Sequence, residues 1–189
     1  MNQVIFCTGN YEKIENARKV GKSFGVVIQQ QALDIDEIQS ENTERILLDK
    51  LSKAHALAEQ PVIVSDDSWE IPALGGFPGP YMKSINHWFS PEDYLRLTST
   101  LQNRAIHLIQ RLGYTDGVVV KTFTHTTEGK LLREIKGNYG DANHKIVSLD
   151  GDKGLSIAEI YDAGENRGER DAFEIWIKFF TWFTAQRNV

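Results

Sequence analysis

Two adjacent carboxylates, Asp66 and Asp67, follow an apolar run in this 189-residue chain. The run, residues 62–64, is typical of a buried strand, so the acids are expected just beyond the end of that strand. Burying a carboxylate is costly unless a cation or hydrogen-bond donors compensate its charge. A divalent metal bound to a polyphosphate would compensate both acids, because Mg²⁺ prefers carboxylate, water and phosphate oxygens. In such a site one carboxylate holds the metal while another polarises a water for attack on phosphorus.

The simpler interpretation treats Asp66 and Asp67 as turn residues that accept hydrogen bonds from their own backbone. That interpretation is weaker here, because open α/β sheets bind their ligands at the carboxyl ends of the strands. A purely structural, dimerising protein would leave the acid pair without a role. We therefore treat the pair as a candidate catalytic element.

A second segment, Thr8-Gly9-Asn10 followed by Lys13, lies where a predicted strand gives way to a helix. Free backbone N–H groups at a helix start attract anions, and the helix dipole adds to that attraction. Gly9 permits close approach of a ligand to the backbone, and Lys13 is spaced to lean back over a bound phosphate. Taken alone, the segment is better interpreted as a simple helix cap with a solvated lysine, because such caps are common.

Further candidate residues surround the long helix predicted over residues 44–59. Four acids precede that helix: Asp34, Asp36, Glu37 and Glu41. Their ordinary role is a solvated loop that complements the helix N-terminus, and their functional role would be a further metal ligand. Lys50 and Lys53 lie one turn apart on the helix and share a face, and for Lys53 we favour an ordinary surface position.

Histidine and cysteine chemistry is not indicated. The five histidines are scattered at spacings unlike those of a zinc site. The single cysteine, Cys7, excludes an intrachain disulfide and is expected to be a small core residue.

Composition restricts the class of protein. Hydrophobic residues make up 41% and charged residues 25% of the chain, as in ordinary globular proteins. The formal net charge of -5 gives no basic surface for nucleic acid, so a phosphate ligand must be held locally. The apolar runs are too short to cross a membrane, and no basic segment of a signal peptide precedes residues 4–6. We expect a cytoplasmic protein that binds neither nucleic acid nor membrane.

The hydrophobic pattern predicts a mixed α/β fold, with a central sheet and flanking helices in one domain over residues 1–189. Strands are predicted at 4–7, 26–31, 62–64, 117–126, 130–136 and 155–161. Helices are predicted from Tyr11 to Gly25, over 44–59, from Ser90 to Leu112 in one or two pieces, and over 173–183 as a buried closing helix. The turn between strands 117–126 and 130–136 is expected at 127–129, and residues 73–81 are too rich in Gly and Pro for regular structure.

Three blocks of the sequence resemble, in order and spacing, the family of inosine/xanthosine triphosphate pyrophosphatases. The blocks are Thr8-Gly9-Asn10-x-x-Lys13, Asp66-Asp67-Ser68 and Ala73-Leu74-Gly75-Gly76-x-Pro78-Gly79-x-Tyr81. The resemblance implies a long central sheet with two lobes around a cleft, and a homodimer. It also implies an Mg²⁺-dependent cut between the α and β phosphates of a nucleoside triphosphate, giving a monophosphate and pyrophosphate.

The same resemblance assigns roles to individual residues. The catalytic residues would be Asp67 and Lys13. The substrate would be held by Thr8, Gly9, Asn10, Lys13, Lys50, Asp66, Ser68 and Lys83. Mg²⁺ would be bound by Asp67 and by Glu37, with Glu41 as the alternative to Glu37.

The second half of the chain departs from the family pattern. The Phe-Gly-Tyr/Trp-Asp-Pro and Ser-His-Arg blocks, which the resemblance implies to recognise the base, are absent. Residues 154–158 and 166–170 occupy their places, and an arginine of the second block survives as Arg167 or Arg170. We therefore predict that the triphosphate end of the site is kept and that its base end is rebuilt.

Two alternatives follow from this departure. The first is a nucleotide-binding module of the same fold without catalysis, which would retain an intact triphosphate in the presence of Mg²⁺. The second is a pyrophosphatase for other modified nucleotides, such as methylated or pyrimidine ones. Rates across a panel of bases would separate the second from an enzyme for inosine and xanthosine triphosphates.

Overall fold

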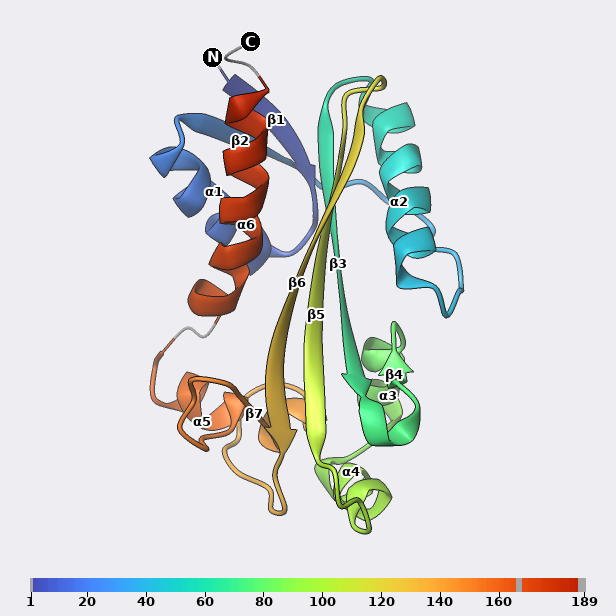
Figure 1. The fold of residues 1–189 in the computed structure, drawn as a ribbon, viewed down its shortest axis with the longest axis vertical. Coiled ribbons are helices and arrows are strands. Elements are labelled where there is room, and N and C mark those ends of the chain that lie inside the picture. The colour runs from blue at the N-terminus through green and yellow to red at the C-terminus, as the bar shows by residue number, and fades with distance from the viewer. Residues whose placement is uncertain (1, 166–167, 187–189) are drawn as a thin grey trace. The chain divides into compact units, whose positions relative to one another are not determined.

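The computed structural model describes residues 2–165 and 168–186 and has a mixed α/β fold, as predicted (Figure 1). Its seven-stranded sheet has the order β2-β1-β3-β5-β6-β7, and β4 pairs with β3 off this path. The strands are β1 (Asn2–Cys7), β2 (Val26–Gln31), β3 (Val62–Ile71), β4 (Phe77–Gly79), β5 (Ala105–Thr115), β6 (Val120–Leu131) and β7 (Val147–Leu149). The helices are α1 (Tyr11–Ser23), α2 (Thr43–Ala58), α3 (Met82–Trp88), α4 (Pro91–Thr98), α5 (Ile157–Asp162) and α6 (Gly168–Ala185), with short 3₁₀ helices η1 (Pro72–Leu74) and η2 (Ala142–Lys145).

The backbone contacts divide the chain into two compact units. Unit 1 comprises the described residues of Met1–Asp66, Gln110–His125 and Gly168–Val189. Unit 2 comprises those of Asp67–Ile109 and Thr126–Arg167. Strands β3, β5 and β6 contribute residues to both units.

Unit 1 contains the strand, helix and strand predicted at the start of the chain. β1 and β2 pair in parallel from Asn2↔Val26 to Cys7↔Gln31, and α1 connects them. Asn10 caps α1, and Gly25, which has φ 66°, follows its end. The predicted elements are confirmed, although β1 begins at Asn2 and α1 ends at Ser23, because cap and glycine stop carry local signals.

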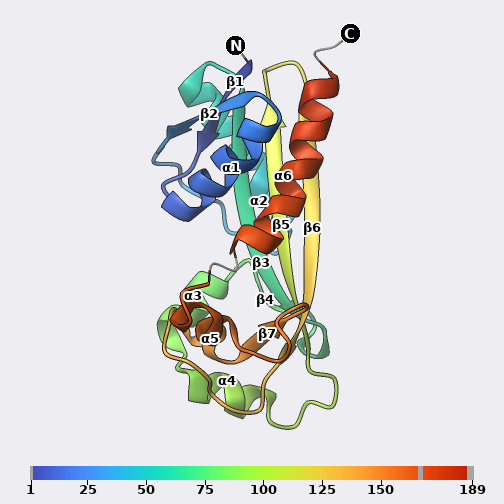
Figure 2. The same ribbon diagram turned by 90° about the vertical axis from the view of Figure 1, so that its left-hand side faces the viewer.

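Alternation along the strands of unit 1 distributes apolar side chains to two faces of the sheet. Val4 and Phe6 pack in one cluster with α1 and α6, whereas Ile5 and Cys7 pack in another with α2. Helices α1 and α6 lie side by side on their face (Figure 2). The predicted closing helix is therefore confirmed, although Ile177 is 44% exposed and α6 is not apolar all round.

The strand that carries the acid pair is longer than predicted. β3 does not end at Val64 but continues to Ile71, so Asp66 and Asp67 lie inside a strand and not beyond its end. Its pairing changes along its length: the β1 register ends at Phe6↔Ile63 and the β4 register begins at Trp69↔Gly79. The neighbouring β5 and β4 keep the chain extended where a pattern of polar residues indicated a loop.

The prediction of a helix to Leu112 was wrong, because α4 ends at Thr98 and β5 begins at Ala105. The predicted helix start is confirmed by a capping box between Ser90 and Asp93. The buried residues Ile106, Ile109 and Leu112 are three apart, a spacing that a helix also shows. Periodicity alone therefore did not distinguish the strand from a helix.

The hairpin was predicted at the wrong place. β6 runs without a break through residues 127–129, and the turn lies between β5 and β6, where Asp116 Oδ1 accepts from the N–H groups of Val118 (3.0 Å) and Val119 (2.8 Å). These backbone hydrogen bonds, that of Val119 first, lower the pKa of Asp116. Gly129 is a strand glycine, since a Cβ there would lie 2.7 Å from Ser148 O of the paired β7.

Two further assignments in unit 2 need correction. Residues 155–161 do not form a strand: Ser156 caps α5 in a capping box with Glu159. Residues 73–81 are not wholly irregular, because η1 and the short β4 form there and β4 pairs with β3. Apolar residues of β3, α4, β5 and α5, including Ile71, Tyr94, Ile106 and Ile157, form the core of unit 2. Within the described residues no helix is both long and apolar enough to span a bilayer.

Candidate functional site

Three hydrogen bonds hold the loop between β1 and α1. Asn10 Oδ1 accepts from the N–H of Lys13 at 3.1 Å, and the N–H of Asn10 donates to Thr8 Oγ1 at 3.1 Å. Gln30 Nε2, on β2, donates to the carbonyl of Thr8 at 3.0 Å. The expected helix cap is thus present and fixes the first turn of α1 in place, but Lys13 is not a simply solvated lysine, because it contacts Ser65.

Two lysines from different helices converge on Ser65 of β3. Lys13 Nζ, on α1, lies 3.4 Å from Ser65 Oγ, and Lys50 Nζ, on α2, lies 3.4 Å from Ser65 O. The helices cover opposite faces of the sheet, but β1 ends at Cys7, so both lysines reach β3 past the end of that strand. The result is a pair of cations beside the N-terminus of α1, which together suit a polyphosphate.

Ser65 was missed as a site residue in the sequence. It stands directly before the acid pair, and the alternation of β3 puts it on the same face as Ile63, which packs with α1. With β3 read to its true length, that alternation would have indicated a contact with a residue of α1.

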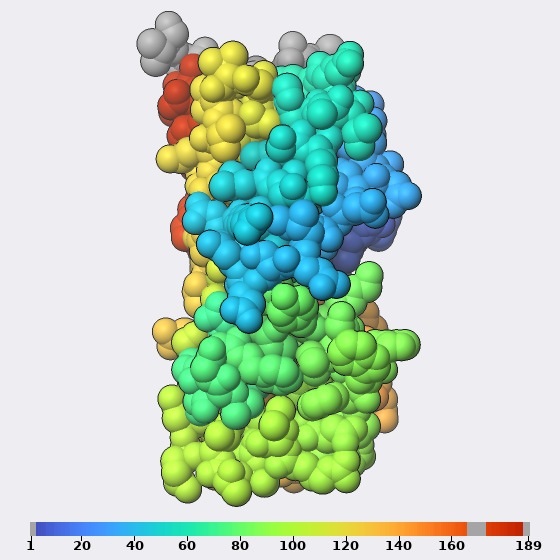
Figure 3. Space-filling view, turned by 90° about the vertical axis from the view of Figure 1, so that its right-hand side faces the viewer, coloured from blue at the N-terminus to red at the C-terminus, as the bar shows by residue number. Residues whose placement is uncertain are grey.

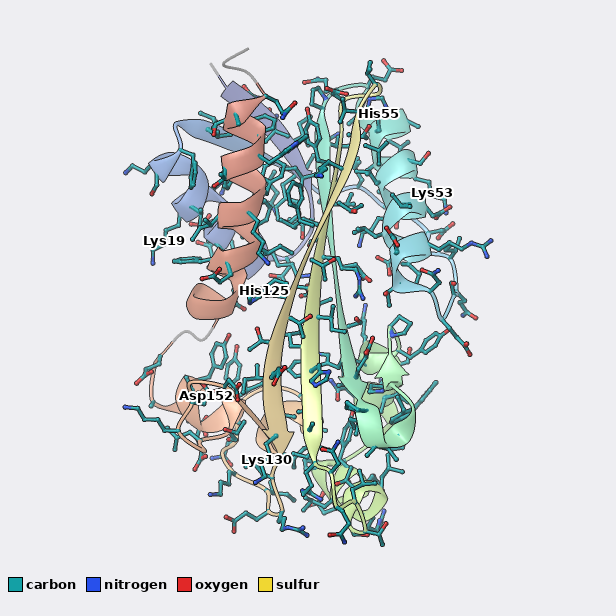
Figure 4. The ribbon with its side chains drawn as sticks, viewed as in Figure 1. Lys19, Lys53, His55, His125, Lys130 and Asp152 are labelled. Carbon is teal, nitrogen blue, oxygen red and sulfur yellow. The ribbon has the colours of Figure 1, made fainter. Side chains whose placement is uncertain are left out.

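Lys50 also pairs with Glu37. Its Nζ lies 2.5 Å from Glu37 Oε1, and the lysine side chain is 19% exposed whereas the glutamate is 49% exposed. The loop of residues 32–42 that carries Glu37 lies at the surface beside α2 (Figure 3). Lys53 forms an ion pair with Asp49 at 2.7 Å and is 40% exposed, as expected of a surface lysine (Figure 4).

Glu41 has different surroundings from Glu37. It lines a hollow of about 350 Å³ in unit 1 with Arg111, Thr122 and Thr124. Of the two alternatives for the metal ligand, the structure brings only Glu37 to Lys50 among the residues it describes.

The acid pair lies in the middle of β3, where both carboxylates are half-buried. Alternation turns their side chains to opposite faces of the strand, so Asp67 shares the face of Ser65. Asp66 belongs to unit 1 and Asp67 to unit 2. Asp66 shares the face of Val62 and Val64, which pack with α2, and Asp67 that of Ile63, which packs with α1. The roles of the two acids stay predictions.

The remaining predicted residues are placed as follows. Ser68 is fully buried, and Lys83 is an exposed residue of α3. Arg167 lies outside the described residues, and the side chain of Arg170 does as well, although its backbone belongs to α6. The predicted roles of these four residues stay predictions.

Cys7 is a buried core residue, as expected. Burial raises the pKa of its thiol to about 11, although the nearby Lys50 lowers it in part. A thiol with that pKa is protonated at neutral pH and is a poor nucleophile.

The donor set suits Mg²⁺ that is shared with a substrate. In the part of the chain that the structure describes, no group of three or more His, Cys, Asp or Glu side chains is placed to hold a metal. Mg²⁺ is commonly bound through one or two carboxylates, with phosphates and waters completing its octahedron. A carboxylate such as Glu37 beside Lys50 fits that pattern better than it fits a closed metal cage.

Neither a close contact nor a positive φ requires glycine at position 9. It is exposed, a Cβ built on it would meet nothing within 4 Å, and it is not among the glycines with positive φ. Space that the protein does not use is space that a ligand can occupy.

We expect Gly9→Ala to weaken binding of inorganic tripolyphosphate about tenfold, equivalent to about 1.4 kcal/mol, with an unchanged Tm. Isothermal titration calorimetry and thermal melts check this. Gly21→Ala is the contrasting variant, because its Cβ would meet Val26 O at 3.0 Å and Phe180 Cζ at 3.1 Å. That variant should lower the Tm and leave binding unchanged. Equal binding by Gly9→Ala and the wild type would contradict the proposed ligand position.

Known proteins resemble this chain in sequence over most of its length. The model of the Ham1 family matches residues 4–169. The dITP/XTP pyrophosphatase of Methanopyrus kandleri is 32% identical over 93% of this chain and 96% of its own. The dITP/XTP pyrophosphatase of Saccharolobus solfataricus is 29% identical over 85% of this chain and 83% of its own.

The fold is shared with solved structures as well. The Ham1 protein of Staphylococcus aureus superposes with a TM-score of 0.77 over 98% of this chain and 100% of its own, at 17% identity. With a family model that covers most of the sequence and relatives that align over nearly its whole length, the chain belongs to the Ham1 family.

Proposed function

We propose that this protein hydrolyses a nucleoside triphosphate between its α and β phosphates, releasing a nucleoside monophosphate and pyrophosphate. The relatives named dITP/XTP pyrophosphatase support a nucleoside triphosphate pyrophosphatase, a hydrolase that acts on acid anhydrides. The observation that carries the proposal is the convergence of Lys13 and Lys50 on Ser65, next to the acid pair of β3.

The residues around the start of α1 would hold the triphosphate. Backbone N–H groups of the first helical turn and the two ammonium groups neutralise phosphate charge, and Thr8 and Asn10 shape the loop that presents them. Charge develops on the phosphoryl oxygens as the anhydride bond breaks. Cations fixed beforehand in this position therefore stabilise the transition state more than the bound substrate.

Glu37 would hold Mg²⁺, and from its place in the motif Asp67 is proposed as the acid that serves the metal or the attacking water. When bound, the metal would supply Lewis-acid polarisation of a phosphate oxygen. Lys50 pairs with Glu37 and would keep that carboxylate oriented while no metal competes for it. A homodimer and a cytoplasmic location, which the sequence indicated, stay predictions.

The base preference is proposed to differ from that of inosine and xanthosine enzymes, since the motifs that the resemblance connects with the base are absent. The test is hydrolysis of a panel that includes dITP, XTP, the canonical triphosphates, and methylated and pyrimidine analogues. Products are separated by chromatography, with and without Mg²⁺ and with chelator.

We expect a monophosphate and pyrophosphate in equal amounts, only with Mg²⁺, and fastest with a base other than hypoxanthine or xanthine. Faster hydrolysis of dITP and XTP would contradict the prediction that the base-binding part of the site has changed. It would still support pyrophosphatase activity. A triphosphate that binds with Mg²⁺ and is recovered intact for every base would instead favour the nucleotide-binding module.

A further inference from the structure

A buried arginine in unit 2 is held in one orientation by neutral acceptors. Arg104 is 6% exposed. Its Nε donates to Leu131 O at 2.8 Å, its Nη1 to Thr98 O at 2.7 Å and its Nη2 to Leu132 O at 2.6 Å. These carbonyls satisfy N–H groups and carry no negative charge. The positive charge is therefore fixed in space without a carboxylate among these acceptors.

Arg133 adds a second positive charge close to that of Arg104. Burial lowers the pKa of Arg104, and the charge of Arg133 lowers it further. Two like charges close together repel each other, and a bound anion would offset that repulsion.

Two hollows of unit 2, of about 420 and 450 Å³, are both lined by Arg104 and Arg133. The larger one, here named the basic hollow, is also lined by Lys130 and Lys153 and has one acid, Asp150. Lys130 lies on β6 (Figure 4). Four cations against one acid contrast with the net charge of -5 of the whole chain.

The loop after β7 completes the wall of the basic hollow. Gly151, Lys153 and Gly154 have φ of 88°, 55° and 84°, and the buried Asp152 accepts from the N–H of Leu149 at 3.2 Å (Figure 4). A left-handed backbone is unfavourable for a lysine, so the loop holds Lys153 in a conformation that L-residues rarely adopt. A Cβ on Gly154 would meet nothing within 4 Å, which leaves open space at this wall.

We propose that the basic hollow binds a small phosphate anion, at a site distinct from the triphosphate site. None of the residues to which the proposed reaction assigns a role lines it. Guanidinium groups bind phosphate oxygens with paired N–H donors, and a side chain that is already immobile loses little entropy on binding. The volume suits orthophosphate, pyrophosphate or the phosphate of a nucleotide.

In a purely structural role, Arg104 would only connect the end of α4 to β6 through its hydrogen bonds. That role explains its own hydrogen bonds and does not explain the other three cations of the hollow. The experiment therefore leaves Arg104 intact and changes Lys130 and Arg133, both exposed.

The test is a ¹H–¹⁵N NMR titration of the full chain with inorganic phosphate, followed by pyrophosphate and a nucleoside monophosphate. The amides of Gly151 and Gly154 report on the basic hollow, and those of Gly9 and Asn10 report independently on the proposed triphosphate site. The Lys130→Ala/Arg133→Ala variant is compared with Lys136→Ala, whose lysine pairs with Glu134 in the same unit and does not line the hollow.

We expect saturable shifts of Gly151 and Gly154 in the wild type and in Lys136→Ala. The double variant should bind at least about tenfold more weakly, a factor that corresponds to 1.4 kcal/mol, and its Gly9 response should be unchanged. The ligand whose chemical-shift changes saturate at the lowest concentration shows whether the hollow prefers an inorganic phosphate or the phosphate of a nucleotide. Unshifted Gly151 and Gly154 amides, or equal shifts in all variants, would overturn the proposal even if the triphosphate site responds.

Discussion

Lys13→Met is expected to lower kcat/KM for triphosphate hydrolysis by about 10²–10³, the loss typical when one preorganised donor to a developing anion is removed. Lys13 Nζ lies 3.4 Å from Ser65 Oγ, and the N–H of the same residue is fixed by the Asn10 cap. The ammonium group is thus positioned before substrate arrives. Methionine keeps the length and helix propensity of the side chain, so the fold should be retained.

Steady-state kinetics on the best substrate of the base panel, together with a thermal melt, check this prediction. Lys22→Met is the matched control, because Lys22 is an exposed lysine in the last turn of the same helix. It should retain wild-type kcat/KM. If both variants kept full activity, the lysine of the Thr8-Gly9-Asn10 segment would be only a solvated residue after a helix cap.

The elements of unit 1 were predictable because their signals are local. Asn10 caps α1, Gly25 follows it, and the neighbouring apolar runs are short and bounded. The half of the candidate site that is proposed to bind phosphate depends on these same signals. The place of Lys13 could therefore be predicted from the sequence, although its contact with Ser65 could not.

The elements that failed depend on partners distant in sequence. β3 continues past Val64 because β5 and β4 pair with it, and no local pattern in the polar residues 65–68 indicates this. Gly129 was taken for a turn residue, whereas it is needed where β7 approaches β6 closely. The Asp116-Gly117 pair is a true turn signal, but the helical spacing predicted for the preceding residues concealed it.

The sequence motif reduced the candidate metal ligands before the long helix to two acids but could not choose between them. The sequence left Glu37 and Glu41 as alternatives, because both precede the same helix. Only the fold shows that Lys50 reaches Glu37 while Glu41 lines a hollow with Arg111. The distinction depends on the path of an irregular loop, which no periodic pattern determines.

Asp67→Asn is expected to lower kcat by about 10²–10⁴, the range for loss of a general acid or base, with little change in Tm. Asparagine has nearly the same shape as aspartate, so the half-buried position in β3 should still pack. The amide has no negative charge for a metal and accepts no proton from water. Acid-quenched single-turnover measurement of pyrophosphate formation gives the rate of the chemical step without product release.

Asp66→Asn is the decisive comparison for this prediction. Asp66 precedes Asp67 in the same strand and is also half-buried, but alternation places it on the opposite face, away from the face of Ser65. The role assigned to Asp67 requires Asp66→Asn to retain much more activity than Asp67→Asn at equal stability. The reverse order would move the catalytic carboxylate to the other face of β3. Equal and small losses would remove the acid pair from the chemistry, and the lysines would then serve binding alone.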